Sequence, residues 1–116
     1  MQKYLTFVPI CGILYAYQFL RGVFMNRLEQ ARNIINICDE NIAKLFEDRM
    51  HAVENVIAYK KENGLPVLDA AREKEVIERN LAKIQDEKLK PYYEDLLVQL
   101  MRISREYQKD ILGKDI

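Results

Sequence analysis

The chain has 116 residues, which is enough for one domain and too short for two independent hydrophobic cores. Its 18 basic residues balance 18 acidic ones, so the charge does not indicate a surface that binds nucleic acid. With 49% hydrophobic and 31% charged residues the chain is not of the disordered class, and two cysteines and one histidine are too few for a disulfide framework or a zinc site.

The first 24 residues, 1–24, form an apolar extension that is open to four interpretations. Its uncharged part, residues 4–20, lies between Lys3 and Arg21. As a helix it would reach roughly 25 Å, against about 30 Å for the hydrocarbon core of a membrane. A proline and a glycine within it weaken such a helix, and no small-residue cleavage site follows. The interpretations are a short anchor, an uncleaved signal, an ordered helix packed on the domain, or an upstream extension of a protein that starts at Met25.

One long helix is predicted next, from Asn26 to about Glu62. No glycine or proline lies between Phe24 and Asn63, and apolar residues recur at a spacing of about seven. At 1.5 Å per residue this helix would run roughly 55 Å, several times the ~13 Å radius of gyration of a compact hundred-residue domain. A helix of this length usually needs a partner chain. The apolar positions are Leu28, Ala31, Ile35, Cys38, Ile42, Leu45, Ala52 and Val56.

Two shorter helices complete an all-α domain. The segment Asn63-Gly64-Leu65-Pro66 ends the long helix, since glycine accepts the left-handed conformation and proline blocks continuation. Asp69 caps a second helix, and a charged connection, residues 85–90, leads to the third. Pro91 suits the first turn of that helix and Gly113 closes it. The inward positions are Val76, Ile77, Leu81 and Ile84, then Tyr93, Leu96, Leu97, Leu100, Met101, Tyr107 and Ile111.

Polar residues interrupt these apolar stripes, and a buried unpaired charge is too costly to persist without a partner. Arg49 takes an apolar slot of the long helix, and Lys60 lies about 20° round the helix and roughly 16 Å along it. The two side chains could converge on one small anion, or Arg49 snorkels and Lys60 is an exposed neighbour of Lys61. Arg32 lies roughly 25 Å from Arg49, so it is either solvated near Glu29 or serves a second copy of the site.

The shorter helices add further polar groups. Asp69, Arg72 and Glu73 share a face near the positive N-terminus of the second helix. The alternative is a cap by Asp69 and a surface ion pair of Arg72. Ser104 and Gln108 lie one turn apart in the stripe of the third helix, so they point two donors at the core or are satisfied by backbone hydrogen bonds.

In their order and spacing, these residues resemble the all-helical chorismate mutase family over about residues 27–112. The resemblance implies that residues 25–116 form a three-helix protomer of an intertwined helical-bundle homodimer. It also implies an enzyme that rearranges chorismate to prephenate in phenylalanine and tyrosine biosynthesis, with no metal and no cofactor. The segments that carry it are Arg32 with the run ending at Glu40, residues 45–49, Lys60, residues 64–73, and Ser104-Arg105-x-x-Gln108.

The resemblance further implies roles for single residues. Lys60 and Gln108 would donate to the ether oxygen, where negative charge gathers as the C–O bond breaks. Arg49 and Arg32 of the partner subunit would bind the two carboxylates. The other substrate-binding residues would be Ser104, which assists the carboxylates, Arg72, which adds positive potential, and Glu73 with the backbone near Asp69, which accept from the ring hydroxyl.

Two other functions stay open beside the mutase. An isochorismate pyruvate-lyase on the same scaffold needs similar cations for a similarly shaped dianion. A non-catalytic helical dimer, tethered to a membrane by residues 4–20, would use its polar stripe residues only to fix register. We expect chorismate, prephenate and a second copy of the chain as partners, and no nucleic acid. We expect a cytoplasmic protein, or a membrane-associated or exported one if the extension is an anchor or a signal.

Overall fold

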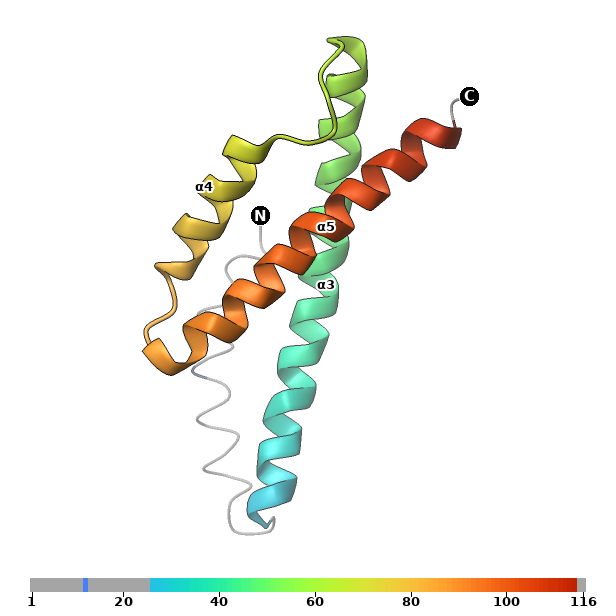
Figure 1. The fold of residues 1–116 in the computed structure, drawn as a ribbon. Coiled ribbons are helices and arrows are strands. Elements are labelled where there is room, and N and C mark those ends of the chain that lie inside the picture. The colour runs from blue at the N-terminus through green and yellow to red at the C-terminus, as the bar shows by residue number, and fades with distance from the viewer. Residues whose placement is uncertain (1–11, 13–25, 115–116) are drawn as a thin grey trace. The chain divides into compact units, whose positions relative to one another are not determined.

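The computed structural model describes Gly12 and residues 26–114, and residues 26–114 are almost entirely helical (Figure 1). No β-strand occurs among these residues, so the predicted all-α class is confirmed. The interpretations of residues 1–24 concern a segment that, Gly12 apart, lies outside the described residues. None of the helices in the described part has the length and apolar character needed to span a bilayer. The elements are α3 (Arg27–Glu62), α4 (Ala70–Leu81), the 3₁₀-helix η1 (Glu87–Leu89) and α5 (Lys90–Lys114).

The predicted long helix is present as α3, and local signals fix both of its ends. At its start, the Asn26 side chain accepts a hydrogen bond from the backbone N–H of Glu29 at 2.8 Å, which satisfies one orphan donor of the first turn. At its end, Gly64 has a φ of 65°, a conformation that glycine adopts without strain. The N–H of Leu65 then reaches back to the carbonyl of Lys60 at 2.8 Å and closes the last turn.

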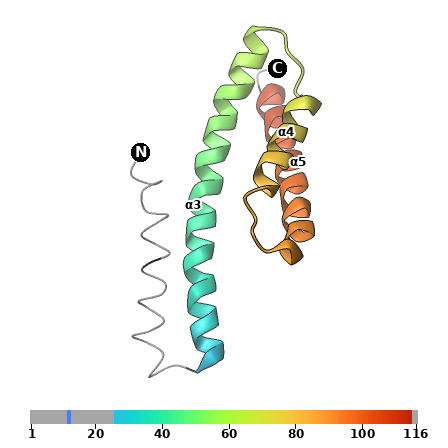
Figure 2. The ribbon, with the colours of Figure 1, turned by 90° about the vertical axis from the view of Figure 1, so that its left-hand side faces the viewer.

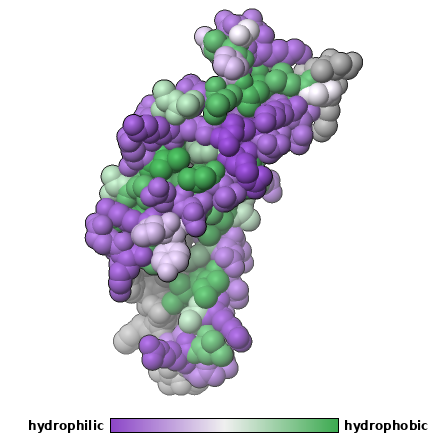
Figure 3. Space-filling model, in the orientation of Figure 1, coloured by the Kyte–Doolittle hydropathy of each residue, from purple (hydrophilic) through white to green (hydrophobic). Residues whose placement is uncertain are grey.

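The chain divides into two compact units, residues 1–46 and 47–116, and the division falls within α3. In the first unit, the apolar stripe of α3 is exposed: Leu28 is 57%, Ile35 55% and Ile42 62% accessible. Cys38, predicted at a core position, is exposed as well, so that prediction was wrong for the single chain. Hydrophobic groups reach the surface of the chain between hydrophilic ones (Figure 3).

The second unit has a small core to which α3, α4 and α5 all contribute. α4 contacts α5, and η1 connects the two (Figure 2). Burying an aliphatic side chain of this kind contributes about 1.5–3 kcal/mol, so the core is modest. The buried apolar residues are Val53, Ile57, Val76, Leu97 and Met101.

A few sequence predictions for α5 and its surroundings were wrong. Leu96 was expected to face inward and is 58% exposed, because Leu97 and Met101, four residues apart, take the buried side of the helix. Gly113 was expected to end the helix but continues it to Lys114. The charged connection before α5 also contains η1, which the apolar pattern did not predict.

A cluster of Glu54 and His51 from α3 and Tyr107 from α5 links these helices outside the core. The Tyr107 hydroxyl donates to Glu54 Oε2 at 2.6 Å, and His51 Nδ1 lies 3.0 Å from the same oxygen. The hydrogen bond from Tyr107, followed by that from His51, lowers the pKa of Glu54. The same bond raises the pKa of Tyr107 because it favours the neutral phenol beside a carboxylate.

Candidate active site

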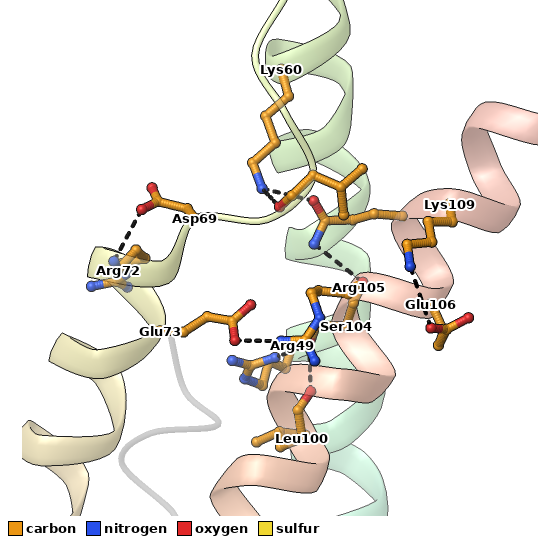
Figure 4. Close-up of polar contacts among 12 residues, drawn as sticks. Arg49, Lys60, Asp69, Arg72, Glu73, Leu100, Ser104, Arg105, Glu106 and Lys109 are labelled. Atoms are coloured by element: carbon orange, nitrogen blue, oxygen red, sulfur yellow. Dashed lines mark hydrogen bonds and ion pairs between the residues drawn. The ribbon is translucent and has the colours of Figure 1, made fainter.

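One cavity of about 270 Å³ in the second unit gathers most of the polar residues that the sequence singled out. It is lined from α3, from α4 and the loop before it, and from α5 (Figure 4). Seven of the eight predicted substrate-binding residues line it. Arg32 does not: it lies in the first unit and is exposed. The polar lining consists of Arg49, Lys60, Asp69, Arg72, Glu73, Ser104 and Gln108, and the apolar lining of Ala52, Val53, Val56, Val67, Val76 and Met101.

The Arg49 guanidinium is held by Ser104. Nη1 of Arg49 donates to Ser104 Oγ at 2.6 Å, and the Ser104 hydroxyl donates its own proton to the carbonyl of Leu100 at 2.8 Å. Ser104 is only 7% exposed. It is therefore a buried polar residue whose hydrogen bonds are satisfied, and it also accepts from the Arg49 cation. Its single proton is already in use, which makes Ser104 a support for Arg49 in this state.

Lys60 and Gln108 form a second linked pair. The Lys60 ammonium donates to the carbonyl of Val67 at 2.6 Å and to Oε1 of Gln108 at 2.9 Å. Nε2 of Gln108 donates to the carbonyl of Ser104 at 3.1 Å. An ammonium has three N–H groups and an amide two, so each of the pair keeps one N–H that no described residue accepts. Both remaining donors belong to side chains that line the cavity.

The start of α4 agrees with both interpretations of Asp69 and Arg72, as a helix cap with a surface ion pair and as part of the polar face. Asp69 caps the helix, accepting from the backbone N–H of Arg72 at 3.0 Å, and the Arg72 side chain pairs with Glu75 at 3.0 Å. Both Asp69 and Arg72 nevertheless line the cavity. The pKa of Arg49 is lowered, mainly by burial of its guanidinium and further by the positive charge of Arg72. An arginine stays protonated despite such a shift.

Glu73 has a partner that sequence reasoning missed. Nη1 of Arg105, on α5, forms an ion pair with Oε1 of Glu73, on α4 (Figure 4). Thirty-two positions separate the two residues, and no helical spacing rule pairs residues on different helices. The only sequence signal was the place of Arg105 next to Ser104 in a segment that carries the family resemblance.

The arrangement suits a small anionic ligand. Three cations, those of Arg49, Lys60 and Arg72, line the cavity with two carboxylates, one of which is neutralised by Arg105. Apolar side chains complete the wall, and a low local dielectric strengthens charge interactions. Buried or backbone acceptors hold Arg49 and Lys60 in place before any ligand arrives.

Comparison with known proteins adds one finding to this geometry. The family model described as chorismate mutase type II matches residues 31–109, more than two thirds of the chain. The matched span contains all the residues that line the cavity, and also Arg32. Neither a curated protein nor a solved structure matches the chain.

Proposed function

This chain belongs to the chorismate mutase type II family, and we propose that it rearranges chorismate to prephenate in the cavity described above. The observation that carries the proposal is that two cations line one cavity and each is held by a polar residue of α5. Ser104 holds Arg49, and Gln108 holds Lys60. Chorismate is a flexible molecule with two carboxylates, a ring hydroxyl and an enol ether. Its rearrangement is intramolecular and needs the reacting carbons to be held close together.

Binding supplies the first part of the catalysis. Cations that hold both carboxylates keep the dianion in the compact pose that leads to reaction, and fixing this pose lowers the entropic part of the barrier. We assign one carboxylate to Arg49. Its guanidinium lines the cavity and is half-buried, and Ser104 engages only one of its nitrogens, which supports this role. Arg72 contributes positive potential from the start of α4.

Electrostatic stabilisation supplies the second part. As the C–O bond breaks, the ether oxygen gains negative charge, and donors already aimed at it stabilise the transition state more than the substrate. Lys60 and Gln108 each keep one N–H for this purpose. Their other hydrogen bonds, to Val67 and Ser104, hold them still, so little reorganisation is needed at the moment of reaction.

For the second carboxylate we propose a cation from another chain, in a homodimer that supplies Arg32 of the partner subunit. Support comes from the apolar stripe of α3, where Leu28, Ile35 and Ile42 are exposed at intervals of seven residues. Such a stripe on a 36-residue helix is typical of a helix that packs along its length against another one. Arg32 lies on the same stretch of α3 and is exposed in the single chain.

The test of the function is to supply purified protein with chorismate alone and to follow both the loss of chorismate and the formation of prephenate. Loss of chorismate without prephenate would refute the proposal. The same protein is given isochorismate, and release of pyruvate in place of mutase activity would establish the lyase instead.

The test of the shared site is to mix two inactive variants, Arg32→Ala and Arg49→Ala. A mixed dimer with shared sites contains one site with both arginines, so partial activity should return on mixing. No recovery after verified subunit exchange would show that each site is built within one chain.

A further inference from the structure

The ion pair between Arg105 and Glu73 lies at the edge of the cavity. Glu73 lines the cavity, whereas Arg105 is not among its lining residues. The two side chains are 28% and 21% exposed, so the pair is largely shielded from water. It is the contact between ionised side chains that joins α4 to α5 in the described part of the chain.

The pair engages only one oxygen of Glu73. Arg105 donates to Oε1, and none of the described residues donates to Oε2. A carboxylate has two oxygens and several acceptor positions, so Oε2 keeps its capacity to accept a hydrogen bond. A glutamate without a fixed partner would sample several rotamers, and Arg105 restricts it to those that keep Oε1 on the guanidinium.

The pair also removes an electrostatic obstacle. A cavity for a dianion contains Asp69 and Glu73, and each carboxylate repels the ligand at short range. The charge of Asp69 is partly offset by the positive N-terminus of α4, where its side chain accepts a hydrogen bond from a backbone N–H. Glu73 has no such backbone partner, and Arg105 neutralises its charge.

We propose that Arg105 is a positioning residue, which holds the Glu73 carboxylate so that Oε2 accepts a hydrogen bond from the ring hydroxyl of the substrate. This role rests on the proposed mutase function. Arg105 does not touch the substrate, and its effect on the reaction passes through Glu73 alone.

The test is a double-mutant cycle with Arg105→Ala, Glu73→Ala and the double variant. Loss of one charge-assisted hydrogen bond is expected to lower kcat/KM roughly 10- to 100-fold in each single variant. Because both residues act through the same contact, the double variant should be no slower than Glu73→Ala. Arg105→Lys keeps the charge without the planar fork, and it should recover part of the loss.

Arg102→Ala is the matched control. Arg102 also lies on α5, but it is exposed and its Nε donates to Gln99 on the same helix at 2.9 Å. This variant removes the same charge from the same helix and should leave kcat/KM unchanged.

A second substrate separates positioning from a purely structural role. With a chorismate analogue whose ring hydroxyl is replaced by hydrogen, Arg105→Ala should lose less activity relative to wild type than it does with chorismate, because only the charge repulsion by Glu73 remains. Equal losses with both substrates, or additive losses in the double variant, would overturn the proposal for Arg105 alone. An inactive wild-type protein would instead refute the mutase function, and the role of Arg105 with it. If Arg105→Ala fails to fold, Arg105→Lys with the two substrates decides between the same outcomes.

Discussion

Replacing Ser104 by alanine removes the hydroxyl that holds the Arg49 guanidinium in the cavity wall. Nη1 of Arg49 donates to this hydroxyl at 2.6 Å, and Ser104 is only 7% exposed, so water does not easily replace the lost acceptor. A hydrogen bond to a charged group contributes roughly 1.5–3 kcal/mol. Because Arg49 itself is only half-buried, the loss of binding free energy should lie in the lower part of this range, roughly 1.5–2 kcal/mol. This corresponds to about a 10- to 30-fold weaker binding.

This loss should fall on KM. The carboxylate that Arg49 is proposed to bind carries the same charge in the substrate and in the transition state, so its loss weakens both to a similar extent. In Ser104→Ala we expect KM to rise about 10- to 30-fold and kcat to change by less than about threefold. The assay is the continuous loss of chorismate with prephenate quantified at the end point, accompanied by thermal unfolding of each protein.

Gln99→Ala is the control for this variant. Like Ser104, Gln99 lies on α5 and accepts a hydrogen bond from an arginine, but this arginine is Arg102 and the contact is exposed. This control should change neither constant. A fall in kcat at unchanged KM would refute the reasoning, since Ser104 would then act on the transition state itself. Unchanged kinetics with a lowered melting temperature would refute it as well, because Ser104 would serve stability alone.

Further predictions concern the other charged groups. Arg49→Ala should lower kcat/KM by several kcal/mol, on the order of 100-fold or more, and a change below about threefold would place Arg49 outside the site. Because Gln108 does not titrate, mutase activity should be flat from about pH 6 to 8, and a steep change there would show that the reaction depends on a titrating group instead. Tyr107→Phe should be less stable than wild type near neutral pH. Since Glu54 has its pKa lowered from 4.5 and Tyr107 its pKa raised from 10.0, the difference should shrink as pH falls below the first value or rises above the second. Urea unfolding at several pH values would check this, and a difference independent of pH would contradict it.

Much of the fold was predictable because its signals are local. The absence of breakers before Asn63, the glycine at position 64 and the cap at Asp69 each act over one helical turn, and the helix bounds follow from them. The identity of the buried residues was harder to predict. A stripe of apolar residues shows which side of a helix seeks a partner, but it does not show whether that partner lies within the same chain. Cys38, placed inward by its spacing, is exposed in the single chain for this reason, whereas Leu96 is exposed because Leu97 and Met101 take the buried side of α5.

The candidate site was predictable as a set of residues and not as a set of contacts. The spacing of Arg49 and Lys60 on one helix indicated that both could serve one anion, and both line the same cavity. Their partners lie on α5, beyond the reach of helical periodicity. The pair of Glu73 and Arg105 shows the limit most clearly, because it depends on how α4 packs against α5, which no spacing within either helix specifies.

The hydrogen bond from Lys60 to the carbonyl of Val67, seven residues later, has a consequence for relatives of this chain. One residue provides both the carbonyl that ends α3 and the ammonium proposed to act on the ether oxygen, and a loop carbonyl seven positions later holds that ammonium in place. An insertion or deletion in this loop would disturb one of the two acceptors that hold the amine and leave the other, Gln108 on α5, in place. Homologues with a different loop length are therefore expected to hold the amine less firmly and to turn over substrate more slowly.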